Sequence, residues 1–393
     1  MIFADMDKMK IRIFLPLLLL FGFILSLDTV SALEYVHFKH QGKEQTEEGR
    51  VIHEAPEGIA FESRDGQYFV ITSKNLLSRK SDEAPFVPYT KTEMIERLQK
   101  EFPPDKGFYY LDTHDPFIIV YTTSKPFANW YGNLLKKLHE QYVLHWTRLG
   151  VKLTQPEFLM VAIVLSNEER FRQYAKQDSV PLLKEQCAYY HKSTNRIAMY
   201  DMSGQQALRE GIQRRANAAD IQGFLRQPDS YNNIRSVIHE AVHQVGFNTG
   251  MHPRFTPNPI WLCESLAVFH EVPDPKNRIG WTLGPHINRD RLEQLKRYLG
   301  KPQQESPIRK MIRDDNLFKQ PDTALDHYAL AWGLTYYLVK KRPKELAAYL
   351  AILQEKTLNS DDDAAIRLQE FESCFGDDWK TFDKECFNFL RRL

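Results

Sequence analysis

One segment constrains this chain more than any other: residues 234–246, which read IRSVIHEAVHQVG. Its apolar residues recur at positions 234, 237, 238, 241, 242 and 245, the spacing of one face of a helix. We therefore predict a helix with a buried face. Two histidines and a glutamate interrupt this apolar helix, and ionisable groups are costly to bury unless something pairs with them. The fold must therefore bring a partner to these groups, and a metal ion would offset their cost.

The spacing of the polar residues indicates what that partner is. His239 and His243 stand four residues apart, so both imidazoles leave the same face of the helix, one turn apart. Two nitrogens placed in this way can converge on one Zn²⁺ at about 2.0–2.1 Å each. Glu240 follows the first histidine, where a carboxylate reaches a metal-bound water without ligating the metal. This is the HExxH pattern of zinc hydrolases, with Glu240 as the candidate general base.

A second apolar helix, predicted over residues 260–269, supplies the third ligand that a catalytic zinc site needs. It carries one acidic residue, Glu264, in its middle, with Leu262 and Leu266 on either side. A proline-rich loop over 253–259 can fold this helix back against the first one. An acidic side chain in such surroundings is expected to point inward only if it has a partner. We predict that Glu264 is the third zinc ligand.

The two segments together resemble the gluzincin metallopeptidases. The resemblance is carried by residues 239–244 (HEAVHQ) and 261–267 (WLCESLA), which are similar to the HExxH and later W-x-x-E-G-x-A motifs of that group. The peptidase MA-like families are the most similar, and the aminopeptidase N family is more distantly so. This resemblance implies Zn²⁺ bound by His239, His243 and Glu264. It also implies a zincin-like peptidase domain, in which a mixed sheet is followed by the active-site helices.

The chain departs from the gluzincin motifs at two points. Ser265 stands where glycine is usual, and serine is also small. No G-x-M-E-N segment is present, so the free-amine anchoring of true aminopeptidases is not carried over. Beyond the motifs, the mature chain resembles a bacterial family of secreted peptidase MA-like proteins. The supporting segments lie at residues 121–124, 189–197 and 247–250.

Hydrolysis by such a site also needs a hydrogen-bond donor for the oxyanion that develops on the substrate carbonyl. Related peptidases carry a tyrosine at the start of a comparable downstream helix, and Tyr328 holds that place in the segment 326–338. His327 is the competing candidate. The implied reaction is metal-assisted hydrolysis of a peptide bond, with Glu240 as general base and Tyr328 as oxyanion donor.

Two other functions fit the same residues. The protein could be an exported binding or structural module with a closed zinc site, for which Cys263, His252 and His270 are nearby candidates for a fourth ligand. Cys263 adjoins Glu264 on one helix and points about 100° away from it. A structural site has no use for Glu240, which favours the enzyme. Zinc-dependent hydrolysis of a non-peptide amide, such as a cell-wall crosslink, is the third alternative.

The chain begins with the three parts of a secretory signal. Lys8, Lys10 and Arg12 precede an apolar run over 13–27, and small residues follow at 30–32. The run is shorter than the roughly 20 residues of a spanning helix, so we favour a cleaved signal over residues 1–32 to a retained membrane anchor. Export to the periplasm or the exterior is therefore expected, with no membrane span in the mature chain.

The mature chain is predicted to be an α+β protein. Short strands punctuated by turns, such as 58–62 and 67–71, indicate a small β-rich module over 33–104. The remainder, 105–393, is the predicted peptidase domain. In it strands at 117–121, 158–165 and 196–200 and a helix at 128–149 come before a helical C-terminal part.

Charge and cysteine content limit the partners. The chain has 52 Lys and Arg against 51 Asp and Glu, too balanced for nucleic-acid binding through a broad basic surface. The expected partner is a peptide or protein substrate, selected by a local cleft.

Four cysteines are too few for a disulfide scaffold. We expect Cys374 and Cys386 to pair, and Cys187 and Cys263 to be buried free thiols.

Overall fold

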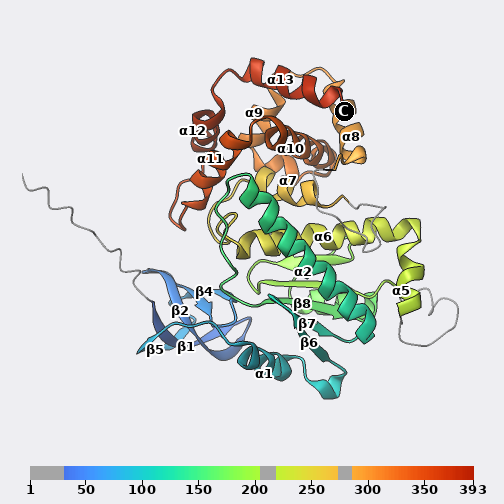
Figure 1. The fold of residues 1–393 in the computed structure, drawn as a ribbon. Helices are drawn as coiled ribbons and strands as arrows, with labels where there is room; N and C mark the ends of the chain where they lie inside the picture. The colour runs from blue at the N-terminus through green and yellow to red at the C-terminus, as the bar shows by residue number, and fades with distance from the viewer. Residues whose placement is uncertain (1–30, 204–217, 273–285) are drawn as a thin grey trace, which may run out of the picture.

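The computed structural model describes residues 31–203, 218–272 and 286–393 (Figure 1). The predicted signal segment lies almost wholly outside these residues. Among the described residues, no helix has the length and apolar character needed to cross a bilayer. The architecture is α+β, as the sequence predicts, with two sheets and a helical C-terminal part.

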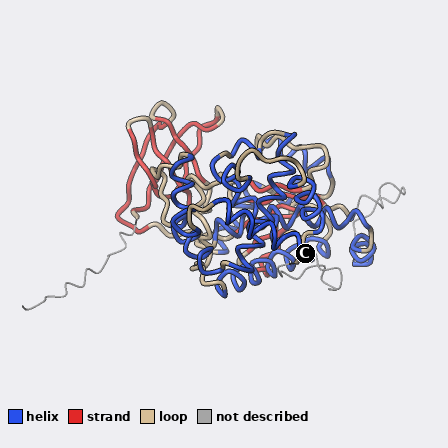
Figure 2. The backbone as a smooth tube through the Cα atoms, turned by 90° about the horizontal axis from the view of Figure 1, so that it is seen from above, coloured by secondary structure: helices blue, strands red, loops and turns tan. Residues whose placement is uncertain are grey.

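The first sheet is formed by the N-terminal residues and is antiparallel, with the strand order β4-β3-β2-β1-β5. Its strands are β1 (Ala32–His40), β2 (Lys43–Ala55), β3 (Gly58–Ser63), β4 (Tyr68–Thr72) and β5 (Leu76–Pro85). The strands predicted at 58–62 and 67–71 are confirmed as β3 and β4. Alternating apolar residues, among them Phe38, Phe61 and Phe69, build its own small core. Figure 2 shows these strands gathered to one side of the molecule.

The second sheet has the order β6-β7-β8-β10-β9. Its strands are β6 (Tyr109–His114), β7 (Phe117–Tyr121), β8 (Met160–Leu165), β9 (Ala188–His191) and β10 (Arg196–Tyr200). The three central strands are parallel, and the edge strands β6 and β9 are antiparallel to their neighbours. The central strands are buried on both faces, which explains their continuous apolar sequences. Helices α1 (Lys91–Glu101) and α3 (Glu168–Gln177) cover one face, and α2 (Lys125–Arg148) and α6 (Pro228–Asn248) cover the other.

The C-terminal part is helical and packs around α10 (Figure 1). Its helices and those leading to it are α5 (Ala218–Leu225), α7 (Ile260–His270), α8 (Arg289–Leu299), α9 (Pro307–Arg313), α10 (Pro321–Lys341), α11 (Pro343–Gln354), α12 (Ala364–Phe375) and α13 (Trp379–Arg391). Helix α10 is buried along most of its length and contacts both α7 and α8. It therefore supports α7 from behind.

Helix α6 is the element that the periodic sequence predicts, although it begins six residues earlier than residue 234. All six of its periodic apolar residues are buried. Gln244 is fully buried and donates to the backbone oxygens of Val161 and Asn195, at 3.1 and 2.8 Å, which ties the helix to the sheet. The helix ends before Gly250, whose φ of 71° is left-handed and suits glycine.

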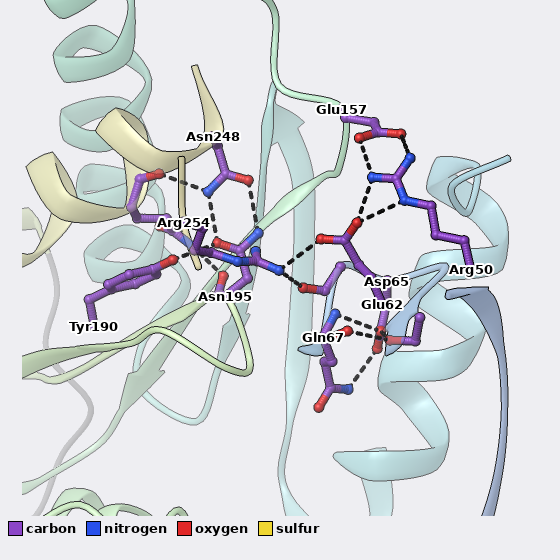
Figure 3. A network of polar contacts seen from close by, with 12 residues as sticks. Arg50, Glu62, Asp65, Gln67, Glu157, Tyr190, Asn195, Asn248 and Arg254 are labelled. Carbon is purple, nitrogen blue, oxygen red and sulfur yellow. Dashed lines mark hydrogen bonds and ion pairs between the residues drawn. The ribbon is translucent and has the colours of Figure 1, made fainter. Parts of the chain in front are cut away.

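Buried ion pairs join the N-terminal sheet to the rest of the protein. Figure 3 shows Glu62 of β3 accepting from Arg50 and from Arg254, each at 3.0 Å. Asp65, in the turn after β3, accepts from Arg97 of α1 at 2.8 Å and lies 3.9 Å from Arg196 of β10. Ion pairs that are largely shielded from water therefore hold the N-terminal sheet against the rest of the protein. The loss of one partner from such a pair destabilises the fold.

Neutralising Asp65 is expected to lower the free energy of unfolding by about 3–5 kcal/mol, because it removes a fully buried anion that pairs with Arg97 and lies beside the buried Arg196. Burial alone would raise the pKa of Asp65, but Arg97 and Arg196 outweigh it and hold the pKa at about 2. The charge therefore stabilises the fold above the unfolded pKa of about 3.9, and this contribution disappears as the pH falls toward 2.

Chemical denaturation of Asp65→Asn at pH 7 and at pH 3 measures this contribution, with the exposed Asp82→Asn as control. The gap between Asp65→Asn and the unmutated protein should narrow at the lower pH. A gap of equal size at both pH values would contradict the assignment.

The state of the four cysteines differs from the predicted one. All four are free thiols, so the expected Cys374–Cys386 disulfide is absent. Cys386 points into the packed face of α13 and is buried, whereas Cys374 lies in the last turn of α12 and is partly exposed. Cys187 is buried and free, as predicted, and Cys263 is half-buried.

Candidate metal centre

The three predicted ligands come together between α6 and α7. His239 and His243 lie one turn apart on α6, and Glu264 faces them from the middle of α7. One nitrogen or oxygen from each side chain lies within 4.8 Å of the others, and no other such cluster occurs among the described residues. The side chains retain 13–20% exposure, so the site is lined by protein and still reachable. The structure thus brings the three predicted ligands together in one cluster.

The spacing of these atoms matches a tetrahedral ion. Ligands held at about 2.0–2.1 Å from a tetrahedral zinc lie about 3.3 Å from one another. Nε2 of His239 lies 3.3 Å from Nε2 of His243 and 3.2 Å from Oε2 of Glu264. Nε2 of His243 lies 3.6 Å from Oε1 of Glu264. The three residues therefore fit a zinc ion without rearrangement of their side chains.

The electrostatics of the site also favour a positive charge at its centre. Desolvation opposes the charged form of His239, but Glu264 and Glu271 outweigh it and raise its pKa well above the usual value. Burial would raise the pKa of Glu264, yet the two histidines lower it to about 2. Desolvation lowers the pKa of His243 to about 4. The two carboxylates around His239 therefore favour a positive charge between the three side chains.

Glu271 is a functional residue that the sequence argument missed. Its Oε2 lies 3.0 Å from Nδ1 of His239, and its other oxygen accepts from Arg235 at 2.8 Å and from Asn288 at 3.3 Å. The carboxylate thus fixes the ring of His239, with Nδ1 as donor and Nε2 facing the other ligands. A signal was present, because Glu271 follows Glu264 by seven residues, almost two helical turns, and so leaves the same face.

Glu240 lies beside the three ligands without joining them. Its Oε2 accepts a hydrogen bond of 3.0 Å from the backbone N–H of Tyr190 in the edge strand β9. Burial, opposed by His239, raises the pKa of Glu240 to about 7. The carboxylate is therefore held by one oxygen and can exchange a proton near neutral pH.

The structure distinguishes the two candidates for the oxyanion donor. Helix α10 begins at Pro321, so Tyr328 lies about two turns inside it and not at its start, where the resemblance places it. The hydroxyl of Tyr328 is hydrogen-bonded to Glu264, and desolvation together with Glu264 raises its pKa. The neighbouring His327 is buried, with Nδ1 against the backbone oxygen of Thr323 at 2.8 Å and its ring packed on Phe318. Of these two residues, only Tyr328 contacts the cluster, through Glu264.

The residues considered as a fourth protein ligand lie apart from this cluster. Cys263, His252 and His270 do not belong to the metal-binding group found among the described residues. His252 packs against the ring of Phe247, and His270 accepts from the indole of Trp146 at 2.9 Å. In the described part of the chain, the geometry offers three protein ligands.

Ser265 occupies the position at which the gluzincin motif has glycine. It is fully buried, donates to the backbone oxygen of Leu262 at 3.0 Å, and accepts from Thr335 of α10 at 2.7 Å. The serine therefore uses its hydroxyl to join α7 to α10 without disturbing Glu264 on the adjacent position.

Comparison with known proteins gives one match. The family described as "Protein of unknown function (DUF1570)" matches residues 233–358, less than half of the chain. The matched segment runs from within α6 to just past α11, and so contains the three ligands together with Glu240, Glu271 and Tyr328. No curated protein matches the chain.

Proposed function

We propose that the protein is a zinc-dependent hydrolase of peptide bonds, of the gluzincin type, that acts after export from the cytoplasm. The observation that carries the proposal is the spacing of His239, His243 and Glu264, which suits a tetrahedral ion, with the carboxylate of Glu240 beside it. Three protein ligands leave one coordination position for water, as in catalytic zinc sites. The resemblance of both helices to the gluzincin motifs points the same way.

Bound in this site, zinc would act as a Lewis acid that polarises the scissile carbonyl and lowers the pKa of water toward about 7. Glu240 is placed to accept the proton of the attacking water and to return it to the leaving amine. The N–H of Tyr190 holds one of its oxygens, which keeps the carboxylate oriented. Tyr328 stays a neutral donor because its pKa is raised, and it would stabilise the developing oxyanion.

The edge of the second sheet supports a peptide as substrate. Strand β9 pairs only with β10, so its other edge is unpaired within the described sheet. The N–H of Tyr190 on this edge points to Glu240, which places the edge beside the catalytic groups. An extended peptide can pair with such an edge through its backbone. A non-peptide amide would make no use of it.

Metal analysis together with digestion of a broad peptide library tests the proposal. We expect about one zinc per chain and cleavage that stops on chelation and returns with added zinc. A protein that binds zinc but cleaves no peptide would favour the alternative function, an exported binding or structural module with a closed zinc site. Cleavage that is unaffected by complete removal of metal would refute the role of the ion.

Glu271→Gln is expected to weaken zinc binding by about 10–100-fold, the usual cost of removing the carboxylate that orients a metal-bound histidine. Glutamine keeps the size of the side chain but accepts the Nδ1 hydrogen bond of His239 without a charge. Titration with zinc against a competing chelator measures the change. Arg235→Lys is the control, because it keeps a cation on Glu271 and leaves the contact with His239 in place. Equal zinc affinity in Glu271→Gln and the unmutated protein would contradict this role.

A further inference from the structure

We propose that Lys192 forms a subsite that binds a carboxylate of the substrate, either an acidic side chain or the free carboxylate at the end of a peptide. This inference rests on the proposed function and concerns which peptides the site selects. Lys192 is the first residue after β9, in the turn that leads to β10.

The ammonium of Lys192 is held over aromatic rings and has no anion. Its Nζ lies 5.3 Å from the ring centre of Phe247 and 5.7 Å from that of Phe255. Rings of this kind attract a cation without neutralising its charge. No carboxylate of residues 31–203, 218–272 or 286–393 forms an ion pair with it. Desolvation lowers its pKa, and the thiol of Cys263, not a carboxylate, opposes this effect. A carboxylate ligand would supply the missing partner.

Two nearby arginines, unlike Lys192, are paired with carboxylates. Arg196 is paired with Glu101 at 2.8 Å, and Arg254 is paired with Glu62 at 3.0 Å (Figure 3 shows the second pair). Each of these two cations already has a carboxylate partner. Lys192 is thus the cation at this end of β9 that remains available to a ligand.

Lys192 also lies on the path of a peptide paired with β9. Tyr190 belongs to β9, and Lys192 lies in the turn that begins directly after the last residue of that strand, His191. Both side chains turn toward α6, because the ring of Tyr190 stacks on Phe247 at 5.9 Å and Lys192 lies over the same ring. A peptide that passes Glu240 at Tyr190 therefore reaches Lys192 about two residues from the scissile bond.

The space beside Lys192 can take such a chain. A cavity of about 1100 Å³ opens between the N-terminal sheet and the β9–β10 turn, and Lys192, Tyr68 and Phe255 are among the residues that line it. Its wall also carries carboxylates, among them Glu101 and Asp178, so Lys192 supplies a local positive charge and not a uniformly basic lining. Tyr68 of β4 stacks on Phe255 with ring centres 3.5 Å apart, and its N–H donates to the backbone oxygen of Ser193 at 2.8 Å. The N-terminal sheet therefore forms one wall of the cavity that borders Lys192.

Cleavage of a proteome-derived peptide library by the zinc-loaded protein tests the subsite. Peptides with Asp or Glu at one position near the cut should be favoured about fivefold over neutral ones, the size of one partly desolvated ion pair, and salt should weaken the preference. Lys192→Met should remove the preference for acidic peptides. Lys192→Glu should replace it with a preference for peptides that carry Lys or Arg at the same position. Peptides with a free or an amidated C-terminus distinguish a terminal carboxylate from a side chain. Lys74→Glu, at an exposed turn, is the control.

Binding to Glu240→Gln makes the result independent of turnover. Fluorescence anisotropy of labelled acidic and neutral peptides should show the same preference, and Lys192→Glu should reverse it. Equal cleavage rates and equal affinities for acidic and neutral peptides would contradict the proposed subsite. The observed cleavage would still support the proposed hydrolase. A charge preference in binding without any cleavage would instead uphold the subsite and count against the hydrolase.

Discussion

Glu240→Gln is expected to lower the rate of peptide hydrolysis by about 10³-fold, within the range that general acid–base catalysis contributes. The amide keeps the shape of the side chain and can still accept the hydrogen bond from Tyr190, but it cannot take a proton from water. His239, His243 and Glu264 are unchanged, so zinc binding should be retained. A fall in kcat at unchanged zinc content is therefore the expected result.

The measurement compares kcat and metal content of the same preparations, with Glu169→Gln on the surface of α3 as the matched control. A loss of zinc that parallels the loss of rate would assign Glu240 to metal binding. Full activity with zinc bound would remove Glu240 from the mechanism.

Glu264→Ala is expected to abolish specific zinc binding, an effect larger than the about 100-fold upper limit for a residue that only orients a ligand. Two histidines on one helix then remain, without the carboxylate that closes the site from α7. Zinc at about 100 times its dissociation constant should stabilise the unmutated protein by about 2.7 kcal/mol and leave Glu264→Ala unaffected. Glu169→Ala is the control for the loss of an exposed glutamate.

Calorimetric titration and thermal unfolding with and without zinc measure these effects. The affinity of the unmutated protein should fall as the pH is lowered, because the raised pKa of His239 means that zinc must displace a proton. Retention of tight zinc binding by Glu264→Ala would place the third ligand elsewhere in the chain.

Helices and strands with a strong local pattern could be predicted. The apolar periodicity of 234–246 required α6, and the continuous apolar run of 117–121 gave β7 at the same residues. Element ends were less certain, because they depend on tertiary contacts. Strand β8 begins at Met160 and not at residue 158, where Phe158 instead packs with Phe86 of the N-terminal part.

Residues whose roles depend on contacts between distant segments could not be predicted. Asp65 needs arginines from α1 and β10, and Lys192 matters only because the turn after β9 places it over the rings at 247 and 255. The prediction of a disulfide between Cys374 and Cys386 was wrong for the same reason. Cys374 and Cys386 lie near each other in sequence, but the orientation of α12 and α13 decides that one thiol is buried and the other partly exposed.

The sequence by itself therefore determined that His239 and His243 lie on one face of α6, because a helix converts a spacing of four residues into a shared face. It also indicated Glu264, because an acidic group in an apolar helix needs a partner. The tertiary structure decided that Glu271 holds His239, that Tyr328 and not His327 turns to the site, and that the edge of β9 borders Glu240. Those outcomes depend on how α7, α10 and β9 pack against α6, and no local pattern encodes that packing.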